Sequence, residues 1–299
     1  MSILVVGSVA LDSVQTPFGK KEEVLGGSAT YFSIAASFFD KVNMVAAVGK
    51  DFPKKYINIF KNKEIGIDGL SVLKGETFRW KGRYEYDLSH AHTIYTRLNV
   101  FRDFHPQIPH SLRGSKFIFL ANINPELQYS VLKQVHKPKF VVLDSMNYWI
   151  EHKRQALEKI LERIDILLLN DAEAREFSGE SNLLKAALVA LTFGPKAVII
   201  KKGEHGVIYA SKKSHFLCPA YLLESIYDPT GAGDTFAGGL IGYLSKACAI
   251  DEPSIRKGII YGSILASFAV EDFSVNRLLE ISIGDIRSRY KHFKKLTKF

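Results

Sequence analysis

Short runs of apolar residues alternate with longer amphipathic segments along most of the chain. Runs without polar alternation are typical of parallel strands that are covered on both faces. The runs that fit this pattern are residues 3–7, 43–48, 116–121, 140–143, 166–169 and 197–201. Helical periodicity lies between them, over residues 29–39, 53–64, 125–135, 152–164 and 182–192. This order predicts an α/β fold with an open, mainly parallel sheet.

Residues 75–104 break this pattern. The segment reads GETFRWKGRYEYDLSHAHTIYTRLNVFRDF, so it alternates and is rich in Thr, Tyr, Phe, Trp and Arg. Such a composition favours antiparallel strands with one polar face, although an irregular loop with one hairpin is an alternative. Because the segment is inserted between two α/β units, we predict a small β lid over the main sheet. We therefore expect one domain over residues 1–299, with a lid formed mainly by about 75–104.

The chain is basic, which limits the partners to be considered. It has 299 residues, of which 46% are hydrophobic, and a net charge of +9 from 40 Lys and Arg against 31 Asp and Glu. A positive balance suits nucleic acid or a small anionic substrate such as ATP. Much of the excess lies in the last helical segment and is typical of a solvated helix face. No nucleic-acid motif accompanies it, so we expect no nucleic-acid partner.

The cysteines and the apolar segments indicate a reducing compartment and no membrane partner. Cys218 and Cys248 are too few and too far apart for a disulfide framework or a zinc site. The N-terminal apolar run has neither a basic region before it nor a cleavage site after it. The longest apolar stretch, residues 258–270, is too short to span a bilayer and predicts a buried helix. We therefore expect a cytoplasmic protein.

The segment YDPTGAGDTF at residues 227–236 carries the most chemical information. It precedes a helix expected over residues 234–248, and its glycines allow a tight turn that exposes successive N–H groups. At a helix N-terminus these groups form an anion hole suited to a phosphate in phosphoryl transfer. Asp234 lies in the first turn, where the helix dipole is expected to keep it ionised and able to accept a proton from a hydroxyl.

A glycine-rich turn before a helix is common, so the turn alone leaves a purely structural interpretation open. The dinucleotide fingerprint does not fit, because Phe236 stands where its third glycine would be. A Walker A lysine motif is also missing from the sequence.

The complete string DPTGAGDTFAGG resembles the C-terminal signature of the ribokinase (PfkB) family of sugar and nucleoside kinases. Three further segments resemble that family: VVGSVALD with GGSATYFSIAASFF near the start, the N-x-x-E motif at residues 170–173, and IIKKGEHGVIY. The resemblance implies a ribokinase-like three-layer sandwich with a β lid. It also implies ATP-dependent transfer of the γ-phosphoryl group to a hydroxyl of a sugar or sugar-like acceptor.

Several roles on the phosphate side follow from the resemblance. Asp234 would be the catalytic base, and the N–H groups of Gly231, Ala232 and Gly233 would form the anion hole. Glu173 would organise Mg²⁺, largely through water, which suits an ion that keeps much of its hydration shell.

The remaining donor-side residues carry less specific signals. Asn170 would bind ATP with Glu173, although the pair also fits a helix cap. The resemblance further assigns the nucleotide to Lys202, Gly203 and Gly206, and a solvated Lys202 is an alternative. Asp228 and Thr230 match positions that hold a monovalent cation, such as K⁺, in some members.

On the acceptor side, the resemblance assigns sugar hydroxyls to Asp12, Gly26 and Gly27. A carboxylate suits this task because it accepts hydrogen bonds from two neighbouring hydroxyls. Asn124 and Asp144 follow strands at the edge where open α/β sheets bind ligands, although Asp144 could instead cap the next segment.

Two features put the identity of the acceptor in question. Tyr31 stands where many family members carry Asn, and together with Trp80 it could stack a nucleoside base. In a strand Arg79, Lys81 and Arg83 share one face, so an anionic acceptor group is predicted if that face lines the cleft. A solvated lid surface is the alternative.

A nucleoside acceptor and a non-catalytic nucleotide- or sugar-binding protein of the same fold are the alternative functions. The unpaired edges of the lid also predict a homodimer formed through it.

Overall fold

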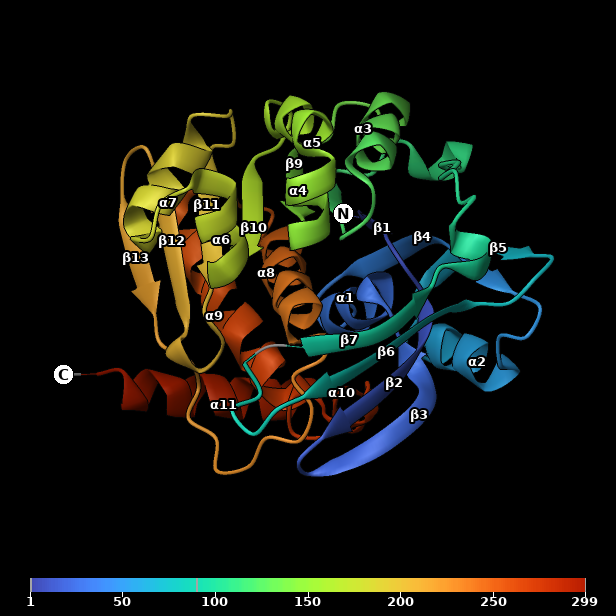
Figure 1. Cartoon of the computed structure of the whole chain (residues 1–299). Coiled ribbons are helices and arrows are strands. Elements are labelled where there is room, and N and C mark those ends of the chain that lie inside the picture. The colour runs from blue at the N-terminus through green and yellow to red at the C-terminus, as the bar shows by residue number, and fades with distance from the viewer. Residues whose placement is uncertain (1, 90, 299) are drawn as a thin grey trace.

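A nine-stranded sheet forms the centre of the molecule in the computed structural model, which describes residues 2–89 and 91–298 (Figure 1). Its strand order is β13-β12-β11-β10-β9-β8-β1-β4-β5. The bounds are β1 (Ser2–Val6), β4 (Lys41–Gly49), β5 (Gly66–Leu73), β8 (Phe117–Leu120), β9 (Phe140–Asp144), β10 (Ile166–Asn170), β11 (Ala197–Lys201), β12 (Val207–Ser211) and β13 (His215–Cys218). Neighbouring strands from β11 to β5 pair in parallel, whereas β12 and β13 pair antiparallel. The predicted mainly parallel sheet is therefore confirmed.

Helices cover both faces of this sheet. One face carries α1 (Ser28–Ala36), α2 (Lys54–Asn62), α8 (Ala232–Ala247), α9 (Glu252–Ala269), α10 (Asn276–Glu280) and α11 (Ile283–Leu296). The other face carries α3 (Pro125–Gln134), α4 (Asn147–His152), α5 (Arg154–Leu161), α6 (Asp171–Ser178) and α7 (Leu183–Leu191). Alternate residues of β1 enter the two cores, with Ile3 and Val5 in one and Leu4 and Val6 in the other. The predicted three-layer architecture is thus confirmed.

The lid is a second sheet, and it is built from two separate segments. Its strand order is β3-β2-β6-β7, with β2 (Ala10–Thr16), β3 (Gly19–Gly26), β6 (Phe78–Tyr84) and β7 (Ala91–Arg97). The predicted lid segment supplies β6 and β7, but β2 and β3 come from residues that precede the first helix. Strand β3 was not foreseen because its sequence, GKKEEVLG, is mostly polar and exposed. Residue 90, within the predicted lid, lies outside the described residues.

Each predicted apolar run forms a strand of the central sheet. Strand β5, which was not among these runs, lies at the edge of this sheet. β5 was not predicted because its sequence, GIDGLSVL, has two glycines and alternates irregularly. The helix expected over residues 258–270 is the C-terminal part of α9. Short 3-10 turns complete the chain at η1 (Asn99–Phe101), η2 (His110–Leu112) and η3 (Gly203–His205). Among the helices in the described part of the chain, none is long and apolar enough to cross a membrane.

Candidate functional site

The carboxyl ends of the parallel strands meet at one edge of the central sheet, and the predicted site residues gather there. Asp144 ends β9, Asn170 ends β10 and Lys201 ends β11. In the paired strands Asn170 lies directly beside Lys201. The lid strand β2 begins shortly after β1 ends at this same edge, and helix α8 begins there as well (Figure 1). Open α/β sheets commonly bind ligands at such an edge.

The turn before α8 has the predicted form. Gly231 is the N-cap of α8 and adopts a left-handed conformation, with φ of 76°. A Cβ atom on Gly231 would lie 2.4 Å from the ring of Tyr31, so both the conformation and the packing require glycine. The Ala232 N–H already donates to the Pro229 carbonyl at 3.2 Å. Of the three predicted anion-hole donors, Gly231 and Gly233 are therefore better placed to serve a ligand than Ala232.

Asp234 is partly buried in the first turn of α8, and loss of hydration has the largest effect on its pKa. Burial raises the pKa of Asp234 to about 7; the charge of Asp144 raises it further, whereas Lys201 lowers it. A pKa of about 7 leaves this carboxyl only partly ionised at neutral pH, whereas the sequence analysis expected it to be ionised. A pKa near neutrality is the range that suits a general base.

Asp12 lies close to Asp234 and is held by the Gly26-Gly27 pair. The Gly27 N–H donates to Asp12 Oδ2 at 3.3 Å. A Cβ atom on Gly26 would lie 1.9 Å from the same oxygen, so the carboxylate occupies the space that a side chain would fill. Burial raises the pKa of Asp12 to about 7; the Gly27 N–H opposes this shift, while the charges of Asp228 and Asp234 add to it. The structure therefore brings together the predicted acceptor-side residues Asp12, Gly26 and Gly27.

Two tyrosines close the space around these carboxylates. Tyr31 is 2% exposed and its ring packs on Gly231, so it has no free face on which a base could stack. Burial, followed by the charges of Asp228 and Asp12, raises the pKa of Tyr31 well above its usual range. Tyr84, which the sequence analysis did not select, accepts a hydrogen bond from the Thr230 hydroxyl at 3.3 Å. This bond joins the lid to the loop before α8.

Asp228 has a structural task in that loop. Its two carboxylate oxygens accept hydrogen bonds from the N–H groups of Thr230, at 2.9 Å, and Ser274, at 3.2 Å. Burial, the main cause, raises the pKa of Asp228. The monovalent cation predicted for Asp228 and Thr230 stays a prediction.

The N-x-x-E pair forms a capping box at the start of α6. The Asn170 side chain accepts from the Glu173 N–H at 2.8 Å, and the Glu173 carboxylate accepts from the Asn170 N–H at 2.7 Å. The capping interpretation is thus confirmed, and it leaves Glu173 buried at the ligand edge. Burial raises the pKa of Glu173 to about 8; Lys201 lowers it and Asp144 raises it.

Lys201 is a partly buried cation that the sequence analysis missed. Its Nζ lies 2.9 Å and 3.2 Å from the two carboxylate oxygens of Asp144. Asp144 is therefore an ion-pair partner, and the alternative that it caps the next helix is wrong, because the N-cap of α4 is Met146. The predicted contact of Asp144 with the acceptor stays a prediction. Burial lowers the pKa of Lys201, but the charges of Asp144 and Glu173 outweigh it, and the net shift is upward. Lys201 could have been selected from the sequence because it ends a predicted parallel strand, at the edge of the sheet where ligands bind.

The other predicted donor-side and edge residues lie in turns. The Lys202 N–H donates to the Gly206 carbonyl at 2.8 Å, which closes the turn that contains Gly203. Lys202 is partly exposed and Gly203 is exposed. The side chain of Asn124 caps α3 by accepting from the Glu126 N–H at 3.0 Å, and the described hydrogen bonds of this side chain are with that residue.

The lid cations face away from the carboxylates of the site. In the β2–β6 pairing, Trp80 lies beside Asp12 and Arg79 lies beside Leu11, so Arg79 points to the opposite face. Arg79 bonds Asp51 at 2.7 Å and Glu23 at 2.8 Å.

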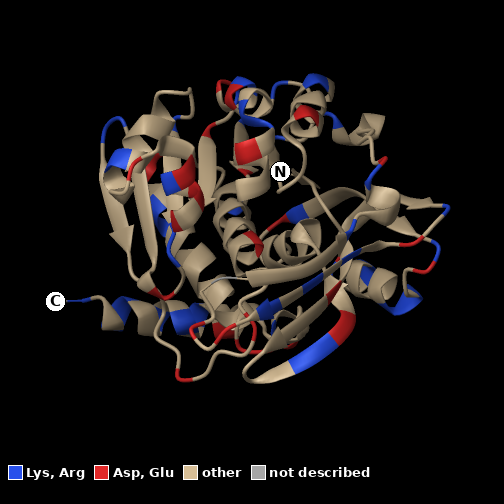
Figure 2. Cartoon of the chain, viewed as in Figure 1, with Lys and Arg blue, Asp and Glu red and all other residues tan. Residues whose placement is uncertain are grey.

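Lys81 and Arg83 also have acidic partners, Glu22 at 3.5 Å and Glu85 at 2.9 Å. Figure 2 shows acidic and basic segments next to each other along this lid surface. The prediction that Arg79 reads an anionic acceptor is corrected, because protein carboxylates already balance this face.

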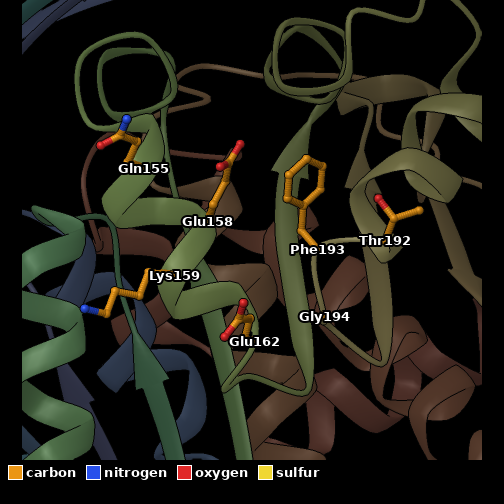
Figure 3. Close-up of a pocket in the computed structure, with 7 residues that line it drawn as sticks. All are labelled: Gln155, Glu158, Lys159, Glu162, Thr192, Phe193 and Gly194. Carbon is orange, nitrogen blue, oxygen red and sulfur yellow. The ribbon is translucent and has the colours of Figure 1, made fainter.

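Two surface hollows lie apart from the predicted residues. A cavity of about 430 Å³ lies between α5 and the turn after α7, lined by Gln155, Glu158, Lys159, Glu162, Thr192, Phe193 and Gly194 (Figure 3). A second, of about 320 Å³, is lined by Phe38, Phe39, Tyr243, Lys246, Tyr261, Ile283 and Arg287. Neither contains a predicted site residue, so the candidate site is defined by its buried carboxylates and Lys201.

A three-layer α/β core, a β lid and a buried carboxylate at a glycine-rich helix start define a kinase-like site. Residues 3–281 match the model of the pfkB family carbohydrate kinases, so the chain belongs to that family. The resemblance found in the sequence is thereby confirmed.

Similar proteins come from archaea and bacteria. The cytidine kinase of Thermococcus kodakarensis is 28% identical over 263 residues, which cover 87% of this chain and 94% of the relative. The structure of Methanocaldococcus jannaschii nucleoside kinase, an archaeal member of the ribokinase family, has a TM-score of 0.77 at 20% identity and covers 97% of this chain and 98% of its own. The structure of a putative ribokinase II from E. coli in complex with ATP and Mg²⁺ has a TM-score of 0.78 at 18% identity, with 97% and 99% covered. The ribokinase-like fold is thus shown.

Proposed function

We propose that this protein transfers the γ-phosphoryl group of ATP to a hydroxyl on the sugar of a nucleoside. The observation that carries the proposal is the placement of two carboxyls, the partly buried Asp234 and the buried Asp12, around the head of α8 and beneath the lid. One carboxyl beside an anion hole suits proton removal, and the other suits binding of the acceptor hydroxyls.

The proposed reaction needs one proton transfer and one displacement. Asp234 takes the proton of the acceptor hydroxyl while the acceptor oxygen forms a bond to the γ-phosphorus. The bond from that phosphorus to the β,γ-bridging oxygen breaks, and ADP leaves. The N–H groups of Gly231 and Gly233 stabilise the charge on the transferred group. Asp234 then returns its proton to solvent.

ATP and Mg²⁺ fit the donor side of the site. Glu173 and Asp234 are carboxyls whose pKa values burial raises to about 8 and about 7, so this side would gain from an added cation. Among the described residues, no group of three or more His, Cys, Asp and Glu side chains could hold a metal. The arrangement therefore fits Mg²⁺ held mainly by water and nucleotide phosphates, with Glu173 and Asn170 next to it. When bound, Mg²⁺ would neutralise phosphate charge.

A nucleoside fits the acceptor side better than an anionic sugar. Asp12 has a raised pKa and acidic neighbours, so a neutral ligand that donates hydroxyl hydrogen bonds is favoured over an anion. Trp80 lies on the same face of the lid as Asp12 and offers an aromatic surface for a base. The similar cytidine kinase and nucleoside kinase support this choice.

The test is an acceptor panel assayed for ADP release with ATP and Mg²⁺. The panel contains pyrimidine and purine nucleosides, ribose, fructose and inositol. We expect at least one nucleoside to have a kcat/KM more than about tenfold above every free sugar, a difference of about 1.4 kcal/mol. A free sugar or polyol that exceeds every nucleoside would overturn the acceptor assignment. No ADP release with any acceptor would favour a non-catalytic binding protein.

A further inference from the structure

We propose that the Lys201 ammonium contacts the phosphoryl group that is transferred, and that Asp144 is the positioning residue that holds it there. This rests on the proposed phosphoryl transfer and adds to it a catalytic residue at the end of β11. The neighbouring Lys202, which the sequence favoured, lies after the strand, as the N-cap of the following 3-10 turn.

The first argument is the location of Lys201 Nζ. A Cβ atom built on Gly233 would lie 3.1 Å from this nitrogen, so the ammonium sits against the first turn of α8. Gly233 presents no side chain between the ammonium and the helix start. The ammonium and the Gly233 N–H therefore flank the same small region, where an anion would meet both.

The second argument is the remaining hydrogen-bonding capacity. An ammonium has three N–H donors. Within the described residues, both hydrogen bonds of Lys201 Nζ go to the two oxygens of Asp144. This pairing lies to one side of the ammonium and leaves donor capacity for an oxygen of a phosphoryl group.

The third argument is the balance of charge. The side chains of Lys201 and Asp144 are 16% and 7% exposed, and Glu173 and Asp234 also act on Lys201 electrostatically. A buried ion pair is weak evidence of stabilisation, since removing two charges from water is costly. The ATP phosphates would enter with Mg²⁺, which offsets the carboxyls of this side, and the Lys201 ammonium is a protein cation already at the same place. Its positive charge would stabilise the negative charge that spreads over the phosphoryl oxygens during transfer.

The experiment compares Lys201→Met, Lys201→Arg and Asp144→Asn with a matched control, Lys196→Met. Lys196 precedes the same strand at its opposite end and pairs with Asp165 at 2.6 Å. We expect Lys201→Met to lower kcat by about 10²–10³-fold, as for the loss of one preorganised donor. Lys201→Arg should restore part of that loss, and Lys196→Met should stay within about twofold of wild type.

Nucleotide binding without acceptor separates this proposal from the proposed function. Lys201→Met should weaken ATP binding at least about tenfold more than ADP binding, because its partner is the terminal phosphate. This ratio can be measured even if no nucleoside proves to be a substrate. Equal weakening of ATP and ADP binding in Lys201→Met, or a folded Lys201→Arg variant that recovers none of the lost preference for ATP, would overturn the proposal.

The double variant tests the positioning role of Asp144. If Asp144 acts through Lys201, Asp144→Asn should lower kcat in the wild-type background and have little further effect in Lys201→Met. Fully additive losses would show that Asp144 acts independently and would overturn that half of the proposal.

Discussion

The two halves of the site differ in charge, although both are built from buried carboxyls. The acceptor half contains Asp12 and Asp228, and the basic side chains of β6 face away from it. The donor half contains Asp144 and Glu173 with a partly buried cation, Lys201, on which both carboxyls act. A half without a nearby cation suits neutral hydroxyls, whereas a half with a cation suits polyphosphate. The difference in one side chain thus separates the two substrates.

Removing the base at the boundary of the two halves should have the largest effect. Asp234→Asn keeps the shape of the side chain but cannot take a proton, so kcat should fall by about 10²–10⁴-fold. ATP affinity and the melting temperature should change little, since burial already disfavours the charged form. Steady-state kinetics and nucleotide titration measure both. A variant that keeps more than about a tenth of wild-type kcat would refute the role of Asp234.

The rate should depend on pH through the same residue. Because the pKa of Asp234 is raised to about 7, the base is protonated and inactive below that pH. The kcat/KM of the wild type should therefore rise about tenfold per pH unit below about 7 and level off above it. Asp12 titrates in the same range, so the control is Asp12→Asn, which should keep this limb. If the rise of kcat/KM with pH disappears in Asp12→Asn, the titrating group is Asp12 and not Asp234.

How much of this site the sequence could predict depended on how local each interaction is. The glycine-rich turn, the Asn170–Glu173 cap and the apolar strands are determined by neighbouring residues, and each was found. Lys201 was missed because its burial depends on Asp144, which lies 57 positions earlier in the chain.

The lid shows the same limit. Arg79 was assigned to a ligand because its partners, Glu23 and Asp51, lie in segments that only the fold brings near. Strand β3 was missed because an exposed lid strand needs few apolar residues. The pattern of apolar residues in a sequence indicates which residues the core buries. It does not indicate which charged residues from distant segments pair with each other.

Asp12 should make the stability of the ligand-free protein depend on pH. Its folded pKa of about 7 lies above its ordinary value of 3.8, so the stabilisation that it contributes is complete at low pH and is lost as pH rises through 7. Asp12→Asn removes this loss. Relative to wild type, its free energy of unfolding should gain up to about 3 kcal/mol between about pH 5 and pH 8. Denaturant unfolding at the two pH values measures the gain, and an equal difference at both would contradict the burial argument.

A substitution at the edge of the lid should change the oligomeric state, and among the predicted changes it should affect catalysis least. Strand β7 is an edge of the lid sheet, and Ile94 on it is 54% exposed. We propose that two copies pair through this edge. Light scattering should show a dimer for wild type and a shift toward the monomer for Ile94→Lys, with Leu222→Lys, at an exposed site outside the lid, as the control. A wild-type mass near 33.5 kDa would contradict the dimer.

Label transfer from ATP tests the central claim most directly. Wild-type protein is incubated with Mg²⁺, a nucleoside and ATP labelled at the γ-phosphate, and the products are separated. The account predicts that the label appears in a nucleoside monophosphate, in equal amount to unlabelled ADP, and that Asp234→Asn forms almost none. Label found in inorganic phosphate alone, or in the phosphate of a free sugar while every nucleoside stays unlabelled, would contradict it.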